Sequence, residues 1–412
     1  MHFWSFLALA AASAEWGLWC LLVGPPAAPI WHLLVPAALA IFNRLAAEAC
    51  DTERHRAPIL GRAGALALAI GFGSTVAALG VVVLGVLFGL RQLMAAPAVA
   101  GPLVATPAGT DGSAFDLAAR LLVVATGLVM TYGYAHGHRR LRVRERTVPL
   151  PGATGALDGY RLVHLSDLHL GPLADRQAVR AVFDRVSALE ADLICITGDI
   201  IDNPKADLES WLPELRRLRA RHGVVAILGN HDRYSGADRI AAAIRRLTPV
   251  RLLRDEVLEL DGEGSPLYVV GLEDHWPPRT DRVLPRLAAT VPPGAPVVVL
   301  AHHPDAFDDA VAAGLPLTFA GHTHGGQLAV PGLRHLNMAR ILVSGRDVGW
   351  FRSEGHRLHV SAGLGVSGQR IRIGVPRDVT VVRLAAAPPR AAFTPVEWTP
   401  ADSTLTAGAS PR

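Results

Sequence analysis

The sequence predicts an α/β domain preceded by an N-terminal bundle of about four membrane-spanning helices. The first third of the chain is almost free of charge, whereas the remainder has the composition of a soluble protein. From Tyr160 onward, short apolar runs alternate with stretches of helical periodicity. Half of all residues are apolar, which is high for a soluble protein and indicates segments solvated by lipid.

Four apolar stretches approach or exceed the roughly 20 residues that a helix needs to cross a bilayer. They are Phe3 to Val23, about Ala27 to Ala47, Gly64 to Leu90 and about Phe115 to Ala135. We expect the first to be retained rather than cleaved as a signal peptide, because no firm basic region precedes it. Glu15 lies inside it, and two roles are open: a functional intramembrane carboxylate, or a polar-paired side chain that faces the bundle.

The distribution of arginine predicts the orientation of these helices. The segment between the third and fourth stretches, from Gln92 to Ser113, has no Lys or Arg. Arginines lie instead between the second and third stretches and after the fourth: Arg54, Arg56 and Arg62, then Arg139, Arg140, Arg142, Arg144 and Arg146. Because cytoplasmic loops collect positive charge, we expect a multi-pass protein of the inner (plasma) membrane with both termini and the α/β domain in the cytoplasm. The last arginines either serve as a stop-transfer flank or also bind anionic membrane lipids.

Charge and cysteine content exclude some classes of protein. The formal net charge is +4, and one short arginine run supplies much of the excess. No broad basic surface with interleaved aromatic residues is visible around the motifs, so nucleic acid is not expected as a partner. The three cysteines, Cys20, Cys50 and Cys195, are too few and too scattered for a disulfide framework.

The α/β domain reads as β-α-β units followed by further strands. We expect a strand at Tyr160 to Leu165, a helix from Val179 to Leu189, a strand at Asp192 to Thr197, a helix from Leu208 to Leu218 and a strand at Val224 to Leu228. Later strands are expected at Leu267 to Val270, Val297 to Leu300, Leu317 to Phe319, Leu358 to Val360 and Val379 to Leu384, with a hairpin turn at Glu263 to Ser265. The first half therefore looks parallel and the second half more antiparallel.

These patterns divide the chain into four parts. Residues 1–138 form the transmembrane region, and residues 139–158 form an arginine-rich linker. Residues 159–384 form the α/β domain. Residues 385–412, rich in Pro, Ala, Ser and Thr, are predicted to be a disordered tail.

Polar side chains follow five of the predicted strands at their carboxyl ends. They occur in five short motifs: Asp167-Leu-His169, Gly198-Asp199, Gly229-Asn230-His231-Asp232, His302-His303-Pro304 and Gly321-His322-Thr323-His324. Ligands bind at this edge of open α/β sheets, so residues far apart in sequence can meet there. Carboxylates, an amide oxygen and imidazoles suit two divalent ions, and such a pair can hold the attacking and leaving oxygens of a phosphate ester.

Each motif alone is a weak signal, because Asp, Asn and Gly are ordinary turn residues and an isolated His-x-His usually lies on the surface or in the core. The occurrence of all five motifs in this order is a much stronger signal. If these motifs had no role beyond structure, eight polar groups would have to lie at sheet ends for unrelated reasons. The sequence therefore favours a dinuclear metal site.

The order of these motifs resembles the calcineurin-like metallophosphoesterase superfamily, over about Val148 to Leu384. The block Gly321 to Gln327, with the later stretches Ser361 to Gly365 and Arg372 to Pro376, is similar to a bacterial branch of membrane-associated phosphodiesterases. That branch includes a UDP-2,3-diacylglucosamine pyrophosphatase of lipid A synthesis. The resemblance implies a β-sandwich flanked by helices. Arg377 follows Pro376 where the branch usually has an acidic residue, which is a departure from its pattern.

The resemblance also implies a role for each motif residue. Asp167, His169 and His324 would hold one metal ion, and Asn230, His302 and His322 would hold the other, with Asp199 bridging the two. His231 would act as the catalytic acid, and Asp232 would orient it and raise its basicity. His302 rather than His303 matches the family ligand, because Pro304 stands two residues after it. The remaining His303 faces either substrate or solvent. Gly325 and Gly326 would let the backbone approach the metals closely.

The motifs predict the bond that is cleaved better than they predict the substrate. The expected cofactors are two divalent ions, with Mn, Fe and Zn all compatible with the ligands. The leading hypothesis is a metal-dependent phosphodiesterase or pyrophosphatase acting on a lipid-linked phosphate ester such as UDP-2,3-diacylglucosamine. One alternative is a general phosphodiesterase or phosphatase for soluble substrates. Another is an inactive membrane sensor or scaffold.

Overall fold

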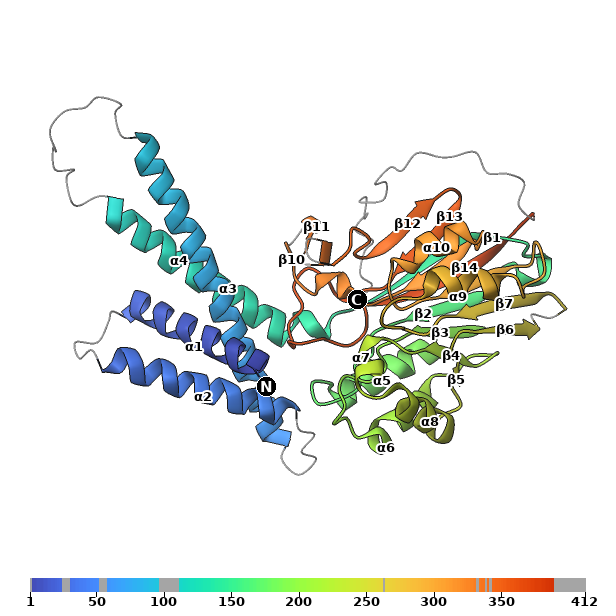
Figure 1. Ribbon diagram of the computed structural model, residues 1–412, viewed down its shortest axis with the longest axis horizontal. Coiled ribbons are helices and arrows are strands. Elements are labelled where there is room, and N and C mark those ends of the chain that lie inside the picture. Colours follow the sequence, from blue (N-terminus) through green and yellow to red (C-terminus); the bar gives the residue numbers. More distant parts are fainter. Residues whose placement is uncertain are drawn as a thin grey trace, which may run out of the picture.

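The computed structural model describes residues 2–23, 30–51, 58–95, 111–261, 264–330, 333–337, 339–340 and 343–388. Figure 1 shows a group of long N-terminal helices on one side and an α/β domain built around two sheets on the other. The last of the long helices leads directly into the first strand of the domain (Figure 1). The two parts predicted from composition are therefore two structural parts.

The N-terminal part consists of α1 (His2–Val23), α2 (Trp31–Asp51), α3 (Pro58–Ala95) and α4 (Asp111–Ala135). The longest, α3, contacts each of the other three. Among the described residues, one helix, Ala114–Arg139, is long and apolar enough to cross a membrane by length and composition. Shorter apolar stretches occupy Leu34–Asn43 and Ala69–Leu84. The helical content matches the sequence prediction, and a bundle of four spans remains a prediction.

Glu15 has a partner within the helices. The side-chain amide of Asn43 in α2 donates a hydrogen bond to the Glu15 carboxylate over 3.2 Å. Asn43 is itself buried. This contact agrees with the second of the two roles considered for Glu15, a polar-paired side chain between helices.

The first sheet has six strands in the order β1-β14-β2-β3-β4-β5. Their bounds are β1 (Leu141–Pro151), β14 (Arg377–Ala387), β2 (Arg161–Leu165), β3 (Leu193–Thr197), β4 (Val224–Ile227) and β5 (Arg251–Leu252). The pairs β2–β3 and β3–β4 are parallel, as the β-α-β pattern predicts. One face of this sheet packs on α5 (Arg176–Ser187), α6 (Leu208–Trp211), η3 (Leu212–Arg217) and α8 (Ala237–Leu247).

The second sheet has the order β12-β13-β9-β8-β7-β6. Its strands are β12 (Gly349–Ser353), β13 (His356–Val360), β9 (Leu317–Ala320), β8 (Val297–Leu300), β7 (Pro266–Gly271) and β6 (Glu256–Asp261). Helices α9 (Thr280–Ala288) and α10 (Ala306–Ala312) cover its outer face. A two-stranded pair, β10 (Ala329–Val330) with β11 (Leu333–Asn337), lies beside it.

The two sheets face each other across a mostly apolar layer, which also holds the buried, hydrogen-bonded pair His164 and His359. Leu162 and Leu193 of the first sheet meet Val269, Val298 and Phe319 of the second, and each of these side chains is completely buried. The architecture is a β-sandwich with helices on both outer faces (Figure 1). Because strands of both sheets run parallel, their carboxyl ends meet along one edge of the sandwich.

Residues 139–158 are not a linker, which corrects the predicted domain boundary. Leu141–Pro151 form β1, which pairs in parallel with β14 along its full length. The arginines that suggested a membrane flank alternate along this strand. Arg144 lies 3.7 Å from Asp378, and the Arg146 guanidinium lies 5.2 Å from the centre of the Trp350 ring. Val148 and Leu150 are buried, so the alternation reflects an amphipathic strand.

Three other expectations change in the structure. The second half is less antiparallel than predicted, because β7, β8, β9 and β13 all pair in parallel and β6 and β12 alone add antiparallel contacts to that sheet. The helix predicted from Leu208 to Leu218 divides into α6 and η3, since Pro213 cannot donate the hydrogen bond that would continue it. The predicted tail cannot begin at residue 385, because β14 extends to Ala387. Glu263 of the predicted hairpin turn and residues 389–412 of the predicted tail lie outside the described part of the chain.

Replacing Leu150 should show that β1 belongs to the fold. Leu150→Ala leaves a cavity in the layer between the sheets, so we expect the free energy of unfolding to fall by about 2–5 kcal/mol. Thr147→Ala, at an exposed position of the same strand, should change it by less than about 0.5 kcal/mol. Thermal melting of the two purified variants measures both changes in stability. If Leu150→Ala melted at the same temperature as Thr147→Ala, the packing of β1 into the domain would be contradicted.

Candidate metal centre

The polar motifs lie at the carboxyl ends of five strands, three from one sheet and two from the other. Asp167 follows β2, Asp199 follows β3, and Asn230 follows β4. His302 follows β8 and His322 follows β9 in the second sheet. A hydrogen bond joins the two groups, since Nδ1 of His302 donates to the backbone oxygen of Thr197 in β3 over 2.8 Å. The sandwich therefore gathers all of the predicted ligands at one place.

The backbone is strained where the predicted ligands sit. Nine non-glycine residues in the described part of the chain have positive φ, and five of them are Asp167 (51°), His169 (44°), Asp199 (51°), His322 (70°) and His324 (51°). This left-handed conformation costs roughly 1–2 kcal/mol at a residue with a β-carbon. Such strain persists where the surrounding structure enforces it, and it gathers at functional sites. The strain thus marks the same residues as the motifs do.

Asp167, His169 and His324 form the first group of donor atoms. One atom from each lies within 4.8 Å of the others, and all three side chains are buried. The Nε2 atoms of His169 and His324 face each other at 3.0 Å, and Nδ1 of His169 lies 3.0 Å from the Asp202 carboxylate. A proton held toward that carboxylate leaves a lone pair on Nε2. These three side chains can hold one divalent ion.

Asn230, His302 and His322 form the second group. The side-chain oxygen of Asn230 lies 2.9 Å from Nε2 of His302 and 2.9 Å from Nδ1 of His322. When His302 is neutral, its Nδ1 proton goes to the Thr197 carbonyl, so Nε2 presents a lone pair to the Asn230 oxygen. Two acceptors facing each other repel, and a cation between them removes the repulsion. The donor set therefore fits a second ion.

Asp199 lies between the two groups. Its Oδ2 is 3.3 Å from Nε2 of His302 and 3.6 Å from Nε2 of His169, so it reaches one member of each group. Its other oxygen accepts a hydrogen bond of 2.8 Å from the backbone N–H of His231. Burial raises the pKa of Asp199, but the charge of His302 opposes this, and the net pKa falls below the usual range. The carboxylate is thus ionised and placed to bridge two cations.

His231 stands beside the donor groups with a fixed ring orientation. Its ring lies edge-on to His169, with ring centres 4.6 Å apart. Nδ1 of His231 donates to the backbone oxygen of Asp202 over 2.7 Å, which leaves Nε2 for a bound molecule. The residue is half-buried, so a ligand at the site can reach it.

Asp232 does not orient His231, contrary to the role that the resemblance implies. Its buried carboxylate accepts three backbone hydrogen bonds, from Gly229, Ile200 and Ile201, over 2.8–3.0 Å. These bonds join the loop after β3 to the loop after β4. Asp232 therefore fixes the distance between Asp199 and Asn230, while the Asp202 carbonyl orients His231.

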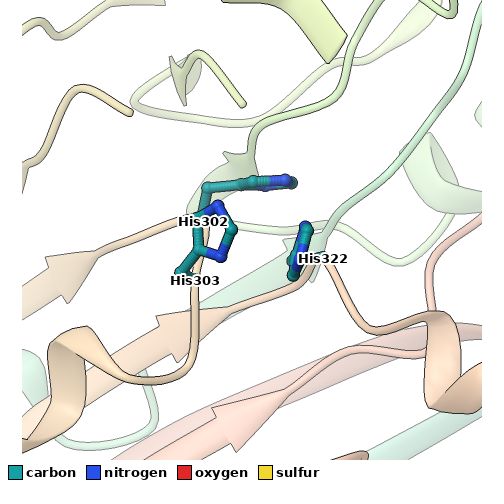
Figure 2. A group of neighbouring side chains, drawn as sticks. All are labelled: His302, His303 and His322. Carbon is teal, nitrogen blue, oxygen red and sulfur yellow. The ribbon is translucent and has the colours of Figure 1, made fainter. Parts of the chain in front are cut away.

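His303 has a partner in the protein. Its Nε2 lies 3.2 Å from Asp274, which also pairs with Arg233 over 2.9 Å. Figure 2 shows His302, His303 and His322 grouped at the ends of their strands, and the rings of His303 and His322 are 3.9 Å apart. The side chain of His303 is 40% exposed, so it borders the second donor group on its open side.

Burial prepares two of the four imidazoles in the donor groups for metal binding. It lowers the pKa of His322 to about 3 and that of His324 well below the usual value, so both are neutral at physiological pH. Burial also lowers the pKa of His169 and of His302, but nearby carboxylates outweigh it in both. Asp202 and Asp199 raise the pKa of His169, while Asp199 and Asp167 raise that of His302 to about 10. A metal ion must displace a proton from His302.

Two glycines allow the close approach of neighbouring loops. A β-carbon on Gly229 would lie 2.3 Å from the Asp199 carboxylate, and one on Gly321 would lie 1.9 Å from the Ser166 hydroxyl. Gly325 has positive φ, and a β-carbon there would lie 3.0 Å from Val375 and 3.3 Å from Val348. The approach of its backbone to the metals stays a prediction, whereas Gly229 and Gly321 permit the close packing of the loops.

The sequence interpretation missed two residues that support the site. Asp202 positions both His169 and His231, and its signal was a second carboxylate three residues after Asp199. Arg372 is almost fully buried, donates to the backbone oxygens of Ala362 and Gly365, and lies 3.2 Å from Nδ1 of His324. The sequence analysis named Arg372 only as the start of a stretch similar to the bacterial branch, and nothing in the sequence predicted that its side chain would be buried beside His324.

The α/β sandwich and its donor set resemble those of metallophosphoesterases. Residues 160–326 match the family model of calcineurin-like phosphoesterases. The match begins at β2 and ends just after the last predicted ligand.

Two curated relatives extend the comparison. The Danio rerio transmembrane protein with metallophosphoesterase domain is 26% identical over 65% of this chain and 62% of its own length. The UDP-2,3-diacylglucosamine pyrophosphatase LpxG of Chlamydia trachomatis is 26% identical over 65% of this chain and 97% of its own length. The solved structure of sulfate thiohydrolase SoxB from Thermus thermophilus is 14% identical, with a TM-score of 0.33, over 55% of this chain and 57% of that chain. The chain thus spans less than two thirds of the fish protein.

Replacing Asp232 should separate its structural role from the catalytic role first expected. Asp232→Ala leaves three buried N–H donors without a partner, each of which costs about 1–3 kcal/mol. We expect a lower melting temperature and weaker metal binding. If Asp232 instead oriented His231, stability would be unchanged and the pH profile of turnover would shift.

Metal binding should release protons. Because the raised pKa of His302 keeps it protonated at pH 8 in the metal-free protein, a bound ion has to expel that proton. Metal affinity should therefore rise with pH up to about 10. Titration calorimetry in Tris and in Pipes, which differ in ionisation heat, should give different apparent heats. Identical heats in the two buffers would contradict a protonated His302.

Proposed function

We propose that this protein is a membrane-anchored enzyme that hydrolyses a phosphodiester or pyrophosphate bond with two divalent metal ions. The observation that carries the proposal is the pair of donor groups that share Asp199 at one edge of the sandwich. Asp167, His169 and His324 would hold one ion, and Asn230, His302 and His322 the other. Manganese, iron and zinc all suit this mixture of nitrogen and oxygen ligands.

The side chains around the ions have separate tasks. When bound, the ions neutralise the phosphate oxygens and lower the pKa of water at the site. Asp202 keeps the Nε2 atom of His169 directed inward, and its carbonyl fixes the ring of His231. Nε2 of His231 would then give a proton to the leaving oxygen. Asp232 holds the loops that carry Asp199 and Asn230 at a fixed distance from each other.

We propose a lipid-linked phosphate ester as the substrate, with UDP-2,3-diacylglucosamine as the named compound and lipid A synthesis as its setting. Two observations support this choice. The domain follows helices whose apolar side chains are widely exposed, including Leu79 and Leu128 at 65% and 68%. The second is the likeness to LpxG over nearly the whole of that relative. We also propose multiple spans of the inner membrane with the site in the cytoplasm; Arg54, Arg56 and Arg62 between the second and third apolar stretches, and the lack of Lys and Arg from Gln92 to Ser113, support this orientation.

Parallel assays on two substrates test the proposal. Full-length protein should hydrolyse bis-p-nitrophenyl phosphate and release UMP from UDP-2,3-diacylglucosamine, and chelation of divalent ions should stop both reactions. Asp199→Ala should abolish turnover because it removes the bridge. His231→Ala should reduce turnover by about 10²–10⁴-fold, the usual contribution of a general acid. Asp281→Ala, a matched change at an exposed aspartate in α9, serves as the control.

The two assays also distinguish the alternatives. Turnover of the model diester and of soluble nucleotides without turnover of any lipid-linked phosphate would favour a general phosphodiesterase or phosphatase. A protein that binds two ions yet hydrolyses neither ester would favour a sensor or scaffold.

A further inference from the structure

The end of α4 holds the backbone of Arg372, in the loop between β13 and β14. The last carbonyl groups of a helix have no partner within the helix. The carbonyl of Gly133, in the last turn of α4, instead accepts a hydrogen bond from the N–H of Arg372 over 3.4 Å. A β-carbon on Gly137, just after α4, would lie 1.8 Å from the carbonyl oxygen of Arg372. The neighbours Ile371 and Ile373 pack on α3 and α4. The loop is therefore seated on the N-terminal helices.

The side chain of Arg372 contacts the first donor group. Its Nη2 donates to the carbonyl oxygens of Ala362 and Gly365 over 2.8 and 2.7 Å, and lies 3.2 Å from Nδ1 of His324. The N–H of Gly365 in turn donates to the carbonyl oxygen of Asp167 over 2.6 Å. Arg372 thus reaches two of the three members of this group, His324 directly and Asp167 through the segment that it ties down.

Burial makes this connection stiff. A buried guanidinium is stable only where its N–H groups have acceptors. Arg372 is almost fully buried, and the loop between β13 and β14 supplies its acceptors, so the side chain and the loop move together. A displacement of α4 would therefore be passed on to His324 and Asp167. The second donor group is held by the sandwich itself, since His302 donates to the carbonyl of Thr197 in β3.

From these contacts we infer that Arg372 is a positioning residue through which the end of α4 sets the geometry of the first donor group. Metal–ligand distances tolerate changes of only about 0.2 Å, so a small displacement of the helix is sufficient to weaken this group. Its affinity for an ion thus depends on how the N-terminal helices sit on the domain, whereas that of the second group does not. The inference rests on the two-ion site of the proposed function and adds the part of the protein that controls one of the ions.

The two donor groups can be measured separately. Manganese binding to the full-length protein, stripped of metal with a chelator, is followed by titration calorimetry. His322→Ala removes a ligand of the second group, so the ion that still binds to this variant reports on the first group. His169→Ala removes a ligand of the first group, and the remaining ion then reports on the second. Each test variant is made in both backgrounds.

Two glycines of α4 provide a test and its matched control. A β-carbon on Gly133 would lie 2.7 Å from side-chain atoms of Ile371 and Ile373, so Gly133→Ala pushes the loop away from the helix. We expect manganese to bind about 10–100-fold more weakly to the first group, as is usual when the support of a ligand is lost, with no change at the second. Gly127→Ala, in the same helix but with no described atom within 4 Å, should leave both groups unchanged.

A second pair of variants covers the case in which Gly133→Ala does not fold. Ile371→Ala removes packing between the loop and the helices without adding a clash, and it should also weaken the first group alone. Ile70→Ala makes the same truncation in α3 at a side chain that is 54% exposed, and it should have no effect on either group. Thermal melting of all four variants shows whether they fold.

The outcomes separate the inference from the proposed function. If Gly133→Ala and Ile371→Ala bound manganese as tightly at the first group as their controls do, the inference would be overturned and the phosphoesterase function would stand. Equal losses at both groups would also overturn it, because a general loosening of the domain would explain them. Selective loss at the first group, in a protein that hydrolyses no phosphate ester, would support the inference and overturn the proposed function. An unaltered protein that binds no manganese would overturn both.

Discussion

The hydrogen bond from Nδ1 of His302 to the carbonyl of Thr197 holds the two sheets in register at their functional edge. Both atoms are buried, and the bond crosses from β8 of one sheet to β3 of the other. It sets which nitrogen of His302 faces the Asn230 oxygen, and hence where a cation can lie. A small shift between the sheets would separate Asp199 and Asn230 on one side from His302 and His322 on the other. The apolar layer between the sheets resists that shift.

Around this bond, the site concentrates groups that would destabilise an ordinary core. Five strained backbone positions, the buried carboxylates of Asp167, Asp199 and Asp232, and several buried imidazoles occupy a small volume. Metal binding would relieve much of this cost by placing cations between the opposed acceptors. The bonds from Asp232 and Arg372 to backbone groups hold the loops in place, so the arrangement does not depend on the ligands alone.

The loop from Leu364 to Val375 connects this chemistry to the N-terminal helices. Arg372 in the middle of the loop reaches His324, while Ile371 and Ile373 on either side of it pack on α3 and α4. Alternate residues of one short segment therefore contact the candidate metal centre and the helices. This alternation explains how the first donor group and the end of α4 come to lie together.

The sequence by itself determined the order and type of most elements, and it predicted which seven polar residues lie together, because strand ends place their polar residues at a single edge in a parallel sheet. It could not assign Asp232, since a carboxylate beside His231 in the chain turns the other way to accept backbone N–H groups. It could not show that β1 belongs to the domain, because alternating arginines suit a membrane flank as well as a strand. Tertiary structure alone placed Asp202 beside His169 and His231 and buried Arg372 beside His324. These features depend on contacts between separate segments, which local periodicity and spacing do not encode.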